Sequence, residues 1–353
     1  ETYDGNFKNL NSNMVADYRL PYHLNLKVSL GYNMMLSDEI STFPSSSLNS
    51  YSNLKPSSNF GNRSLNSWIA EPQLTYENQW ALSKVNVLLG ATWQNLLSEG
   101  STTYATNYSN DLLLESIAAA GNITANNSHS QYRYQGVYAR INYNLLGRYV
   151  LNASGRRDGS SRFAPQNRFA NFAALGAAWL VSEESFLKNR LRFLSFAKIR
   201  ASYGITGNDQ IGDYRYLDTW TPAVGSNYQG VATLNPTALF NPSYAWEKNK
   251  KLEAALELGL LNDRILLSYT FYRNISSNQL VNYTLPTQTG FASVLANLNA
   301  KILNQGWEGQ LETKNIQGNH FSWNTLLNIT LPSNRLLEFP GLAQSSYRNV
   351  YEI

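Results

Sequence analysis

The chain has 353 residues, a formal net charge of +4 and no cysteine, and only 15% of its residues are charged. The lack of cysteine excludes a disulfide scaffold, a cysteine-ligated metal and a cysteine nucleophile. The mild charge, with no run of Lys and Arg, argues against a nucleic-acid groove. No apolar stretch reaches the roughly 18–20 residues that a membrane-spanning helix needs.

Apolar and polar residues alternate with a period of two in several runs, which is the pattern of a β-strand with two different faces. The first clear run is 24–32, and others follow at 84–94, 137–145, 197–205 and 322–331. The polar positions hold mainly Asn, Ser, Thr and Gln. We therefore predict an all-β chain whose sheet has one apolar face and one wet face.

The run 251–260 fits two structures. Its apolar residues alternate as in a strand, but Leu252, Leu256 and Leu260 would also form the stripe of a helix. The neighbouring run 265–273 reads as a strand, and Asn262-Asp263 between the two runs suits a tight turn. A β-hairpin is the better interpretation.

The length of the runs bears on the kind of sheet. About a dozen runs are present, many of about 9–11 residues, whereas strands of soluble proteins average about 5–6 and a tilted strand that crosses a bilayer needs about 9–11. Some connections are very short, such as 146–148 and 262–263. Others are long and polar, namely 37–64, 98–130 and 207–244. Long loops on one side and short turns on the other are typical of a transmembrane antiparallel β-barrel.

A set of short motifs appears in a fixed order along the second part of the chain. Residues 156–163 read Arg-Arg-Asp-Gly-Ser-Ser-Arg-Phe, and Trp179 precedes Ser-Glu-Glu-Ser-Phe-Leu at 182–187. Then come Lys-Ile-Arg-Ala-Ser-Tyr-Gly-Ile-Thr-Gly-Asn at 198–208, Asn-Pro with Trp-Glu-Lys at 241–248, and Asn-Gln-Gly-Trp-Glu at 304–308. This arrangement resembles the SusC/RagA family of TonB-dependent outer-membrane transporters. The motifs cover roughly half of the chain. Residues 1–130 resemble the family only in their succession of alternating strands.

The resemblance implies an integral protein of the Gram-negative cell outer membrane that works without a cofactor. Large plugged barrels have about 22 strands, so residues 1–353 would be one β-barrel portion, with the plug and the final strands absent. The last residues, 347–353, look like the start of a further element. The implied partners are TonB, a SusD-like surface lipoprotein, membrane lipid and an oligosaccharide or peptide substrate, and no nucleic acid. Such a portion alone is not expected to transport anything.

The arginine run cannot face lipid, so we place it in the lumen or in a loop, where Arg, Asp and Ser can pair and stay hydrated. A charge-satisfied hairpin is favoured over direct contact with substrate. The remaining motif residues are also expected to be mainly structural, in the lumen or in loops. The full set is Arg156, Arg157, Asp158, Ser160, Arg162, Trp179, Glu183, Gly207, Asn208, Trp246, Glu247, Gly306 and Trp307.

Aromatic side chains could stack on a sugar or a peptide, but in barrel strands they more often form interfacial girdles. Those in the long loops are the better candidates for substrate binding. They are Trp220, Tyr104, Tyr108 and Tyr228. For these too, a packing role is at least as good an interpretation.

No residue pattern supports an enzyme. His23, His129 and His320 stand apart, and none has the spacing of a metal ligand. No nucleophile elbow or phosphate-binding glycine loop is present. The alternative of a different class is a secreted β-rich adhesin that binds glycans, and it predicts a soluble protein. A passive porin or an outer-membrane enzyme is a third alternative.

Overall fold

The computed structural model describes residues 2–49, 54–188, 190–191, 193–223, 228–229, 231 and 233–342. The predicted element at 347–353 lies outside these residues. Within them, no helix is long and apolar enough to cross a membrane.

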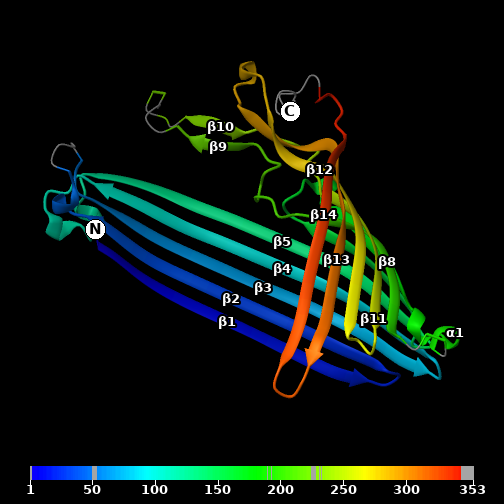
Figure 1. Cartoon of the computed structure of the whole chain (residues 1–353). Coiled ribbons are helices and arrows are strands. Elements are labelled where there is room, and N and C mark those ends of the chain that lie inside the picture. The colour runs from blue at the N-terminus through cyan, green and yellow to red at the C-terminus, as the bar shows by residue number, and fades with distance from the viewer. Residues whose placement is uncertain are drawn as a thin grey trace. The chain divides into compact units, whose positions relative to one another are not determined.

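In the described part of the chain, twelve strands form one sheet in the order β1-β2-β3-β4-β5-β6-β7-β8-β11-β12-β13-β14, and β9 pairs with β10 in a separate hairpin (Figure 1). The all-β prediction is therefore confirmed. The strands are β1 Thr2–Leu20, β2 Leu24–Phe43, β3 Ser57–Trp80, β4 Ser83–Thr106, β5 Asn122–Leu145, β6 Tyr149–Ser160, β7 Phe169–Leu180, β8 Leu194–Asn208, β9 Thr219–Pro222, β10 Leu234–Ala238, β11 Glu247–Leu260, β12 Ile265–Thr284, β13 Ser293–Gln317 and β14 Ser322–Glu338.

Helical structure is confined to single turns. The one α-helical turn is α1 Ser185–Lys188, and the 3₁₀ turns are η1 Ser45–Ser47, η2 Asp111–Leu113, η3 Ile117–Ala119, η4 Pro165–Asn167, η5 Val181–Glu183 and η6 Thr287–Thr289. These bounds refer to the described residues.

Short and long connections alternate, as predicted, except that the connection from Leu180 to Leu194 is longer than the one before it. The β11–β12 hairpin turns at Leu261, Asn262 and Asp263, which have φ values of 55°, 58° and 60°. Asn and Asp tolerate this left-handed region better than most residues, so the predicted turn is confirmed. The residues 251–260 are strand and not helix. Long connections, such as Asn208 to Glu247, lie between the other strand ends.

The chain divides into two compact units. The first consists of Glu1–Tyr18, Lys27–Pro72 and Thr92–Gln135, and the second of Arg19–Leu26, Gln73–Ala91 and Gly136–Ile353. Each unit is described below by itself.

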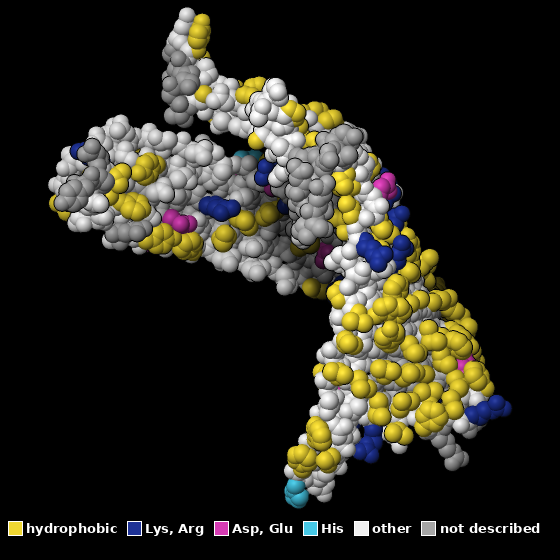
Figure 2. Space-filling view, turned by 45° about the horizontal axis from the view of Figure 1, so that its top comes forward, with side chains coloured by type: hydrophobic (Ala, Val, Ile, Leu, Met, Phe, Trp, Pro, Cys, Tyr) yellow, Lys and Arg dark blue, Asp and Glu magenta, His cyan; other side chains and the backbone are white. Residues whose placement is uncertain are grey.

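In the second unit, the registers of β7, β8 and β11–β14 align apolar residues across the strands. Because successive side chains point to opposite faces, directly paired residues share one face. This face, here called the apolar face, holds Leu252, Ala254, Leu256 and Leu258 of β11, and its side chains form a continuous field in Figure 2. One of its rows runs Trp179, Ile199, Leu256, Tyr269, Gly309 and Ile329.

The opposite face, here called the polar face, carries charged and hydroxyl side chains on the same strands. Arg200 Nε donates to Glu257 Oε1 at 2.9 Å, and Lys198 Nζ lies 3.2 Å from Glu257 Oε2. Arg200 also pairs with Glu253. Mutual pairing lets these charges share one face without a large net field.

In the first unit the strands extend well beyond the apolar runs. Residues 37–64 and 98–130 were predicted to be loops, but β2 continues to Phe43, β3 begins at Ser57, β4 continues to Thr106 and β5 begins at Asn122. The prediction was wrong there because Ser, Asn and Thr-rich strands with water on both faces show no apolar alternation. Only 44–56 and 107–121 connect these strands.

These two connections are packed against each other within the first unit. Ala105, Tyr108 and Leu114 form a small buried cluster. The Ser45 hydroxyl donates to Asp111 Oδ2 at 2.6 Å, and the Ser45 N–H donates to the same carboxylate. These hydrogen bonds lower the pKa of Asp111. The carboxylate therefore stays ionised as it anchors one connection to the other.

Candidate functional site

The arginine motif forms the end of β6 and the turn that follows it. Arg156 Nε lies 2.7 Å from Asp158 Oδ2, and the Asp158 side chain is buried. Arg157 points to the opposite face, where its Nη1 donates to Asn171 Oδ1 at 3.2 Å. Ser160 is fully buried, and its Oγ accepts from the N–H of Arg162 at 3.4 Å. The motif residues thus pair among themselves and with the adjacent β7.

Arg162 ties this turn to the long β8–β11 connection. Its Nε donates to Asp213 Oδ1 at 2.8 Å, and its Nη1 donates to the backbone carbonyl of Asp209 at 2.9 Å. A guanidinium that binds a carboxylate and a carbonyl together fixes both distance and orientation. The turn after β6 and the start of the connection are therefore held as one piece.

An aromatic cluster lies next to this contact. Phe163 and Tyr244 are fully buried, and Trp246 is 5% exposed. The ring centroids of Phe163 and Trp246 are 4.7 Å apart, and Phe172 meets Trp246 edge-on at 5.6 Å. Trp246 Nε1 donates to the Arg168 carbonyl at 3.0 Å, which satisfies the buried indole. We call Phe163, Phe172, Tyr244 and Trp246 the aromatic anchor.

Gly207 is required by this packing. A Cβ at Gly207 would lie 2.2 Å from Cζ of Phe172 and 3.1 Å from Trp246. No larger residue fits between these rings without moving them. The glycine of the motif at 198–208 therefore permits β8 to pass directly against the aromatic anchor.

Burial also affects the Tyr244 phenol. It raises the pKa of Tyr244 to about 12, and the charge of Arg215 opposes this shift. The hydroxyl therefore remains neutral at physiological pH. A neutral, buried phenol is consistent with packing in the anchor and not with acid–base chemistry.

The side chains of two asparagines join the β8–β11 connection to β13 by hydrogen bonds. The side chain of Asn297 donates to the carbonyl of Ala245 at 2.7 Å and accepts from the Ala245 N–H at 2.9 Å, so its amide replaces a missing strand pair. Asn241 Nδ2 donates to the Leu295 carbonyl at 2.8 Å. The connection is fixed at its C-terminal end by these side chains, and the sequence analysis did not identify them.

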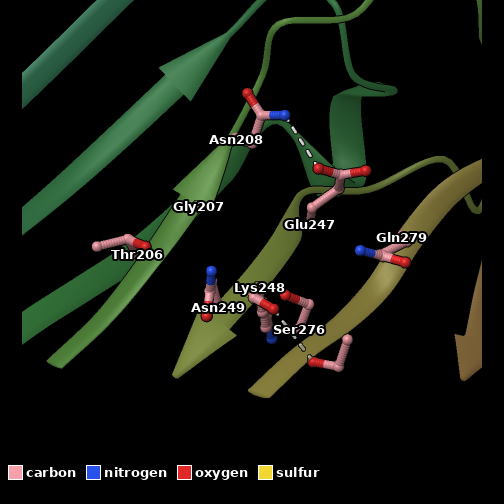
Figure 3. A pocket seen from close by; sticks show the side chains of 9 residues that line it. Thr206, Gly207, Asn208, Glu247, Lys248, Asn249, Ser276 and Gln279 are labelled. Atoms are coloured by element: carbon pink, nitrogen blue, oxygen red, sulfur yellow. Dashed lines mark hydrogen bonds between the residues drawn. The ribbon is translucent and has the colours of Figure 1, made fainter. Parts of the chain in front are cut away.

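A polar pocket of about 270 Å³ opens beside the anchor, at the ends of β8, β11 and β12. Figure 3 shows the side chains of Asn208 and Glu247 pointing toward each other at its edge, where Asn208 Nδ2 donates to Glu247 Oε2 at 3.0 Å. Glu247 Oε1 also accepts from the Leu280 N–H at 2.9 Å. The pocket is lined by Thr206, Gly207, Asn208, Glu247, Lys248, Asn249, Ser276, Ser277 and Gln279.

The lining groups indicate what this pocket can do. Amides, hydroxyls and one carboxylate can hydrogen-bond a polar ligand. No group of three His, Asp or Glu side chains that could hold a metal is found among the described residues. The arrangement favours reversible binding of a polar molecule.

Trp179, near the end of β7, and Glu183, in the connection from β7 to β8, lie at the opposite strand ends. Trp179 Nε1 donates to Glu184 Oε1 at 3.0 Å, and Glu183 pairs with Lys188 on the surface at 3.0 Å. Glu184 is the central acceptor, because Tyr149 and Arg148 also donate to it, at 2.6 and 3.0 Å. The Tyr149 hydrogen bond is the largest cause of the lowered pKa of Glu184.

The sequence analysis chose Glu183 from the Glu-Glu pair, but the structure gives the organising role to Glu184. Only the distances to Trp179 and Tyr149, which come from the β6–β7 register, distinguish the two carboxylates. Sequence alone does not contain that signal.

Gly306 and Trp307 lie in the middle of β13. A Cβ at Gly306 would lie 2.7 Å from both the Tyr272 hydroxyl and the Leu331 carbonyl, so the glycine makes room for Tyr272 on the polar face. Trp307 is on the apolar face, stacked on Tyr269 with a centroid distance of 5.0 Å. Neither residue is near the polar pocket in register.

The four aromatic candidates for substrate binding differ in exposure. Trp220 is 56% exposed on β9, Tyr228 is 71% exposed and Tyr104 is 48% exposed on β4, whereas Tyr108 is only 5% exposed. Tyr108 packs in the cluster of the first unit. Trp220, Tyr104 and Tyr228 therefore remain as accessible rings, and their role stays a prediction.

A protein-family model described as TonB dependent receptor-like, beta-barrel matches residues 1–346. TonB-dependent receptor P39 of Formosa agariphila is 33% identical over 256 residues, which cover 72% of this chain and 24% of that protein. TonB-dependent receptor SusC of Bacteroides thetaiotaomicron is 34% identical over 218 residues, which cover 60% of this chain and 21% of that protein. The chain thus spans less than a third of the length of these two curated relatives.

Among solved structures, the RagAB peptide transporter matches with a TM-score of 0.85. The sequence identity is 20%, and the match covers 96% of this chain and 38% of that chain. At this identity the similarity shows the fold. The chain therefore shares the fold of the matched part of that structure.

Proposed function

Because the chain belongs to the TonB dependent receptor-like β-barrel family, we propose that it forms part of the pore wall of an importer driven through TonB. The family resemblance drawn from the motifs is confirmed, and the protein is an integral protein of the outer membrane. The import activity concerns the whole protein, of which this chain matches a part.

The observation that carries the proposal is the division of the sheet of the second unit into two faces. On β11 the apolar face runs from Leu252 to Leu260, about the length that a tilted strand needs to cross a bilayer. The polar face on the same strands carries the paired charges Arg200, Glu253 and Glu257. In a membrane barrel the apolar face contacts lipid and the polar face lines the lumen.

The substrate that we propose is an oligosaccharide or a peptide. The polar pocket at the ends of β8, β11 and β12 supports this class, because its amides and hydroxyls match the many hydrogen-bonding groups of both ligand types. The similarity to SusC and to the RagAB peptide transporter supports it as well. A SusD-like surface lipoprotein is the proposed outer partner.

In this proposal, the motif residues keep the binding region in shape and do no chemistry. The Arg162–Asp213 pair and the aromatic anchor hold the β8–β11 connection beside the polar pocket. Substrate would bind at loops and plug, and the energised release of the plug would open the path. The residues of this chain would bind, orient and exclude water.

The first test is uptake by cells that express the full-length protein. We expect labelled oligosaccharides or peptides to enter these cells, and we expect uptake to stop when TonB is deleted or the proton gradient is dissipated. A control protein with Asn126→Arg, an exposed position on β5, should import normally. Uptake that persists without TonB would instead indicate a passive pore.

The partner is tested separately by purification from native outer membranes in mild detergent. A stoichiometric surface lipoprotein is expected to co-purify. Recovery of the full-length protein alone, in an active state, would contradict the partner proposal and leave the import proposal intact.

A further inference from the structure

A group of cations lies on the apolar face at its border with the long connections. Lys248 and Lys250 of β11, Arg273 of β12 and Arg335 of β14 are all exposed. Figure 2 shows Lys and Arg side chains along the upper border of the apolar field. We call these four residues the cationic patch.

The registers place the patch on one face. Lys250 pairs with Ile275, Ile275 with Leu303, and Leu303 with Arg335, so Lys250 and Arg335 share one row across four strands. Arg273 pairs with Leu252, one row nearer the apolar field. Neighbouring strands are about 4.8 Å apart and alternate residues of one strand about 6.6 Å apart, so the backbone positions of the four residues lie within a surface of about 14 by 13 Å.

The patch lacks counter-charges. In the registered segments of β6–β8 and β11–β14, Glu338 is the one carboxylate on this face, and it pairs with Lys301. None of the four patch residues forms an ion pair within the described part of the chain. On the polar face of the same strands, by contrast, Lys198 and Arg200 are paired with Glu253 and Glu257. The positive field on the apolar face is therefore not cancelled by the protein itself.

An apolar groove of about 550 Å³ adjoins the patch. Ala177 and Ala201 contribute small side chains, while Leu175 and Tyr203 rise beside them. Leu252 also lines the groove and is two residues from Lys250 on the same face, a step of about 6.6 Å. A groove of this volume with an apolar lining fits part of an acyl chain, and the nearby cations fit the headgroup of the same molecule.

We infer that the cationic patch binds the phosphate groups of an anionic outer-leaflet lipid, with one acyl chain in the adjoining groove. Long loops mark the outer side of a barrel in this membrane, so the patch lies at the depth of outer-leaflet headgroups. Arginine forms bidentate bonds to phosphate and lysine contributes a point charge. The inference uses the outer-membrane location. Lys248 also lines the polar pocket, whereas Lys250, Arg273 and Arg335 do not, so the single variant Lys250→Gln separates lipid binding from the proposed binding of a substrate.

The test uses the full-length protein, purified in mild detergent and stripped of lipid. It is titrated with diphosphorylated lipid A, with the same lipid after removal of its phosphates, and with inorganic phosphate, and bound molecules are counted by native mass spectrometry. The variant combines Lys248→Gln, Lys250→Gln, Arg273→Gln and Arg335→Gln. Two single variants form a matched test and control. Lys250→Gln is the test and Lys251→Gln is the control, because these neighbours are both exposed and point to opposite faces.

Each removed cation should weaken binding of an anionic lipid roughly fivefold. We expect the fourfold variant to bind lipid A at least tenfold more weakly, Lys250→Gln to bind it roughly fivefold more weakly, and Lys251→Gln to bind it like the parent. Heat-modifiable migration on gels checks that each variant is folded. The dephosphorylated lipid should bind weakly to all of them.

Equal binding of lipid A by the parent and the fourfold variant would overturn the inference. So would equal binding of the phosphorylated and dephosphorylated lipids by the parent. If inorganic phosphate bound as tightly as lipid A, the patch would be a site for free anions and the inference would be overturned. Loss of a co-purifying protein from the variant, with lipid binding unchanged, would make it a protein-docking surface.

Discussion

The strands of the two units share one backbone pattern but differ in how their two faces are occupied. In the second unit, β11 carries Leu252, Leu256 and Leu258 on one face and Lys251, Glu253 and Glu257 on the other. In the first unit, residues 57–66, 95–106 and 122–133 carry Ser, Asn, Thr and Gly on both faces. The separation of apolar and polar side chains onto opposite faces therefore reflects the surroundings of each face. Strand pairing itself requires only backbone hydrogen bonds.

The small cores of the two units show the same contrast. The second unit fixes its long connection with large rings, as in the aromatic anchor. The first unit fixes its connections with a smaller cluster and with hydrogen bonds such as Ser58 Oγ to the Leu114 carbonyl at 2.5 Å. Polar strands thus remain ordered where a few residues in their connections supply the packing.

Removal of the central ring of the anchor should give the largest effect. Trp246→Ala is expected to cost about 3–5 kcal/mol, the usual cost of a buried aromatic, and to expose 209–246 to protease. Limited proteolysis and thermal unfolding of the full-length protein in detergent measure both effects. The exposed Trp220→Ala should stay within about 0.5 kcal/mol. Cleavage in 107–121 of the first unit should not change, and a change there would mean that the two cores are coupled.

A charge on the apolar face should give the next effect. Leu256→Arg is expected to cost about 2–4 kcal/mol because it places a cation against lipid. Asn126→Arg, on a polar strand of the first unit, should have almost no effect. Denaturant titration in lipid vesicles compares the two variants. Equal costs would show that the two units do not differ in their surroundings.

The ion pair between the arginine motif and the β8–β11 connection should matter less than either of these. Arg162→Gln or Asp213→Asn is expected to cost about 1.5–2 kcal/mol, because a hydrogen bond between charged groups is lost at a partly exposed site. The double variant should cost less than the sum of the two single variants. Lys188→Gln, which breaks an exposed pair with Glu183, should cost under about 0.5 kcal/mol. Additive single effects would show that the pair does not couple.

Acidification should give the smallest effect at the turn after β7. The folded state lowers the pKa of Glu184, so its stabilisation is present above the unfolded pKa and is lost as pH falls through the folded pKa. The midpoint of thermal unfolding should decrease in acid, and Glu184→Gln should flatten that decrease. An unchanged acid profile in Glu184→Gln would exclude this carboxylate as the cause.

The sequence predicted the strands correctly where one face of the strand is apolar and only the other face is in water. The runs 197–205 and 251–260 have an apolar face, and both are strands. Residues 57–63 and 98–106 lack such a face, so their pairing, which rests on backbone hydrogen bonds, left no signal. The motif order indicated the family. It did not indicate that Phe163 would pack on Tyr244 and Trp246, because that contact joins segments far apart in sequence.

The order of strands in the main sheet has a consequence for how the chain folds. Every neighbour in that sheet is also the next main-sheet strand along the chain, and only the excursion through β9 and β10 interrupts the succession. Sequence-local pairing favours fast assembly, and lengthening one loop adds little closure entropy. The wall can therefore grow one hairpin at a time from either end. The connection between β8 and β11 can vary in length and sequence between relatives without changing the order in which the wall is built.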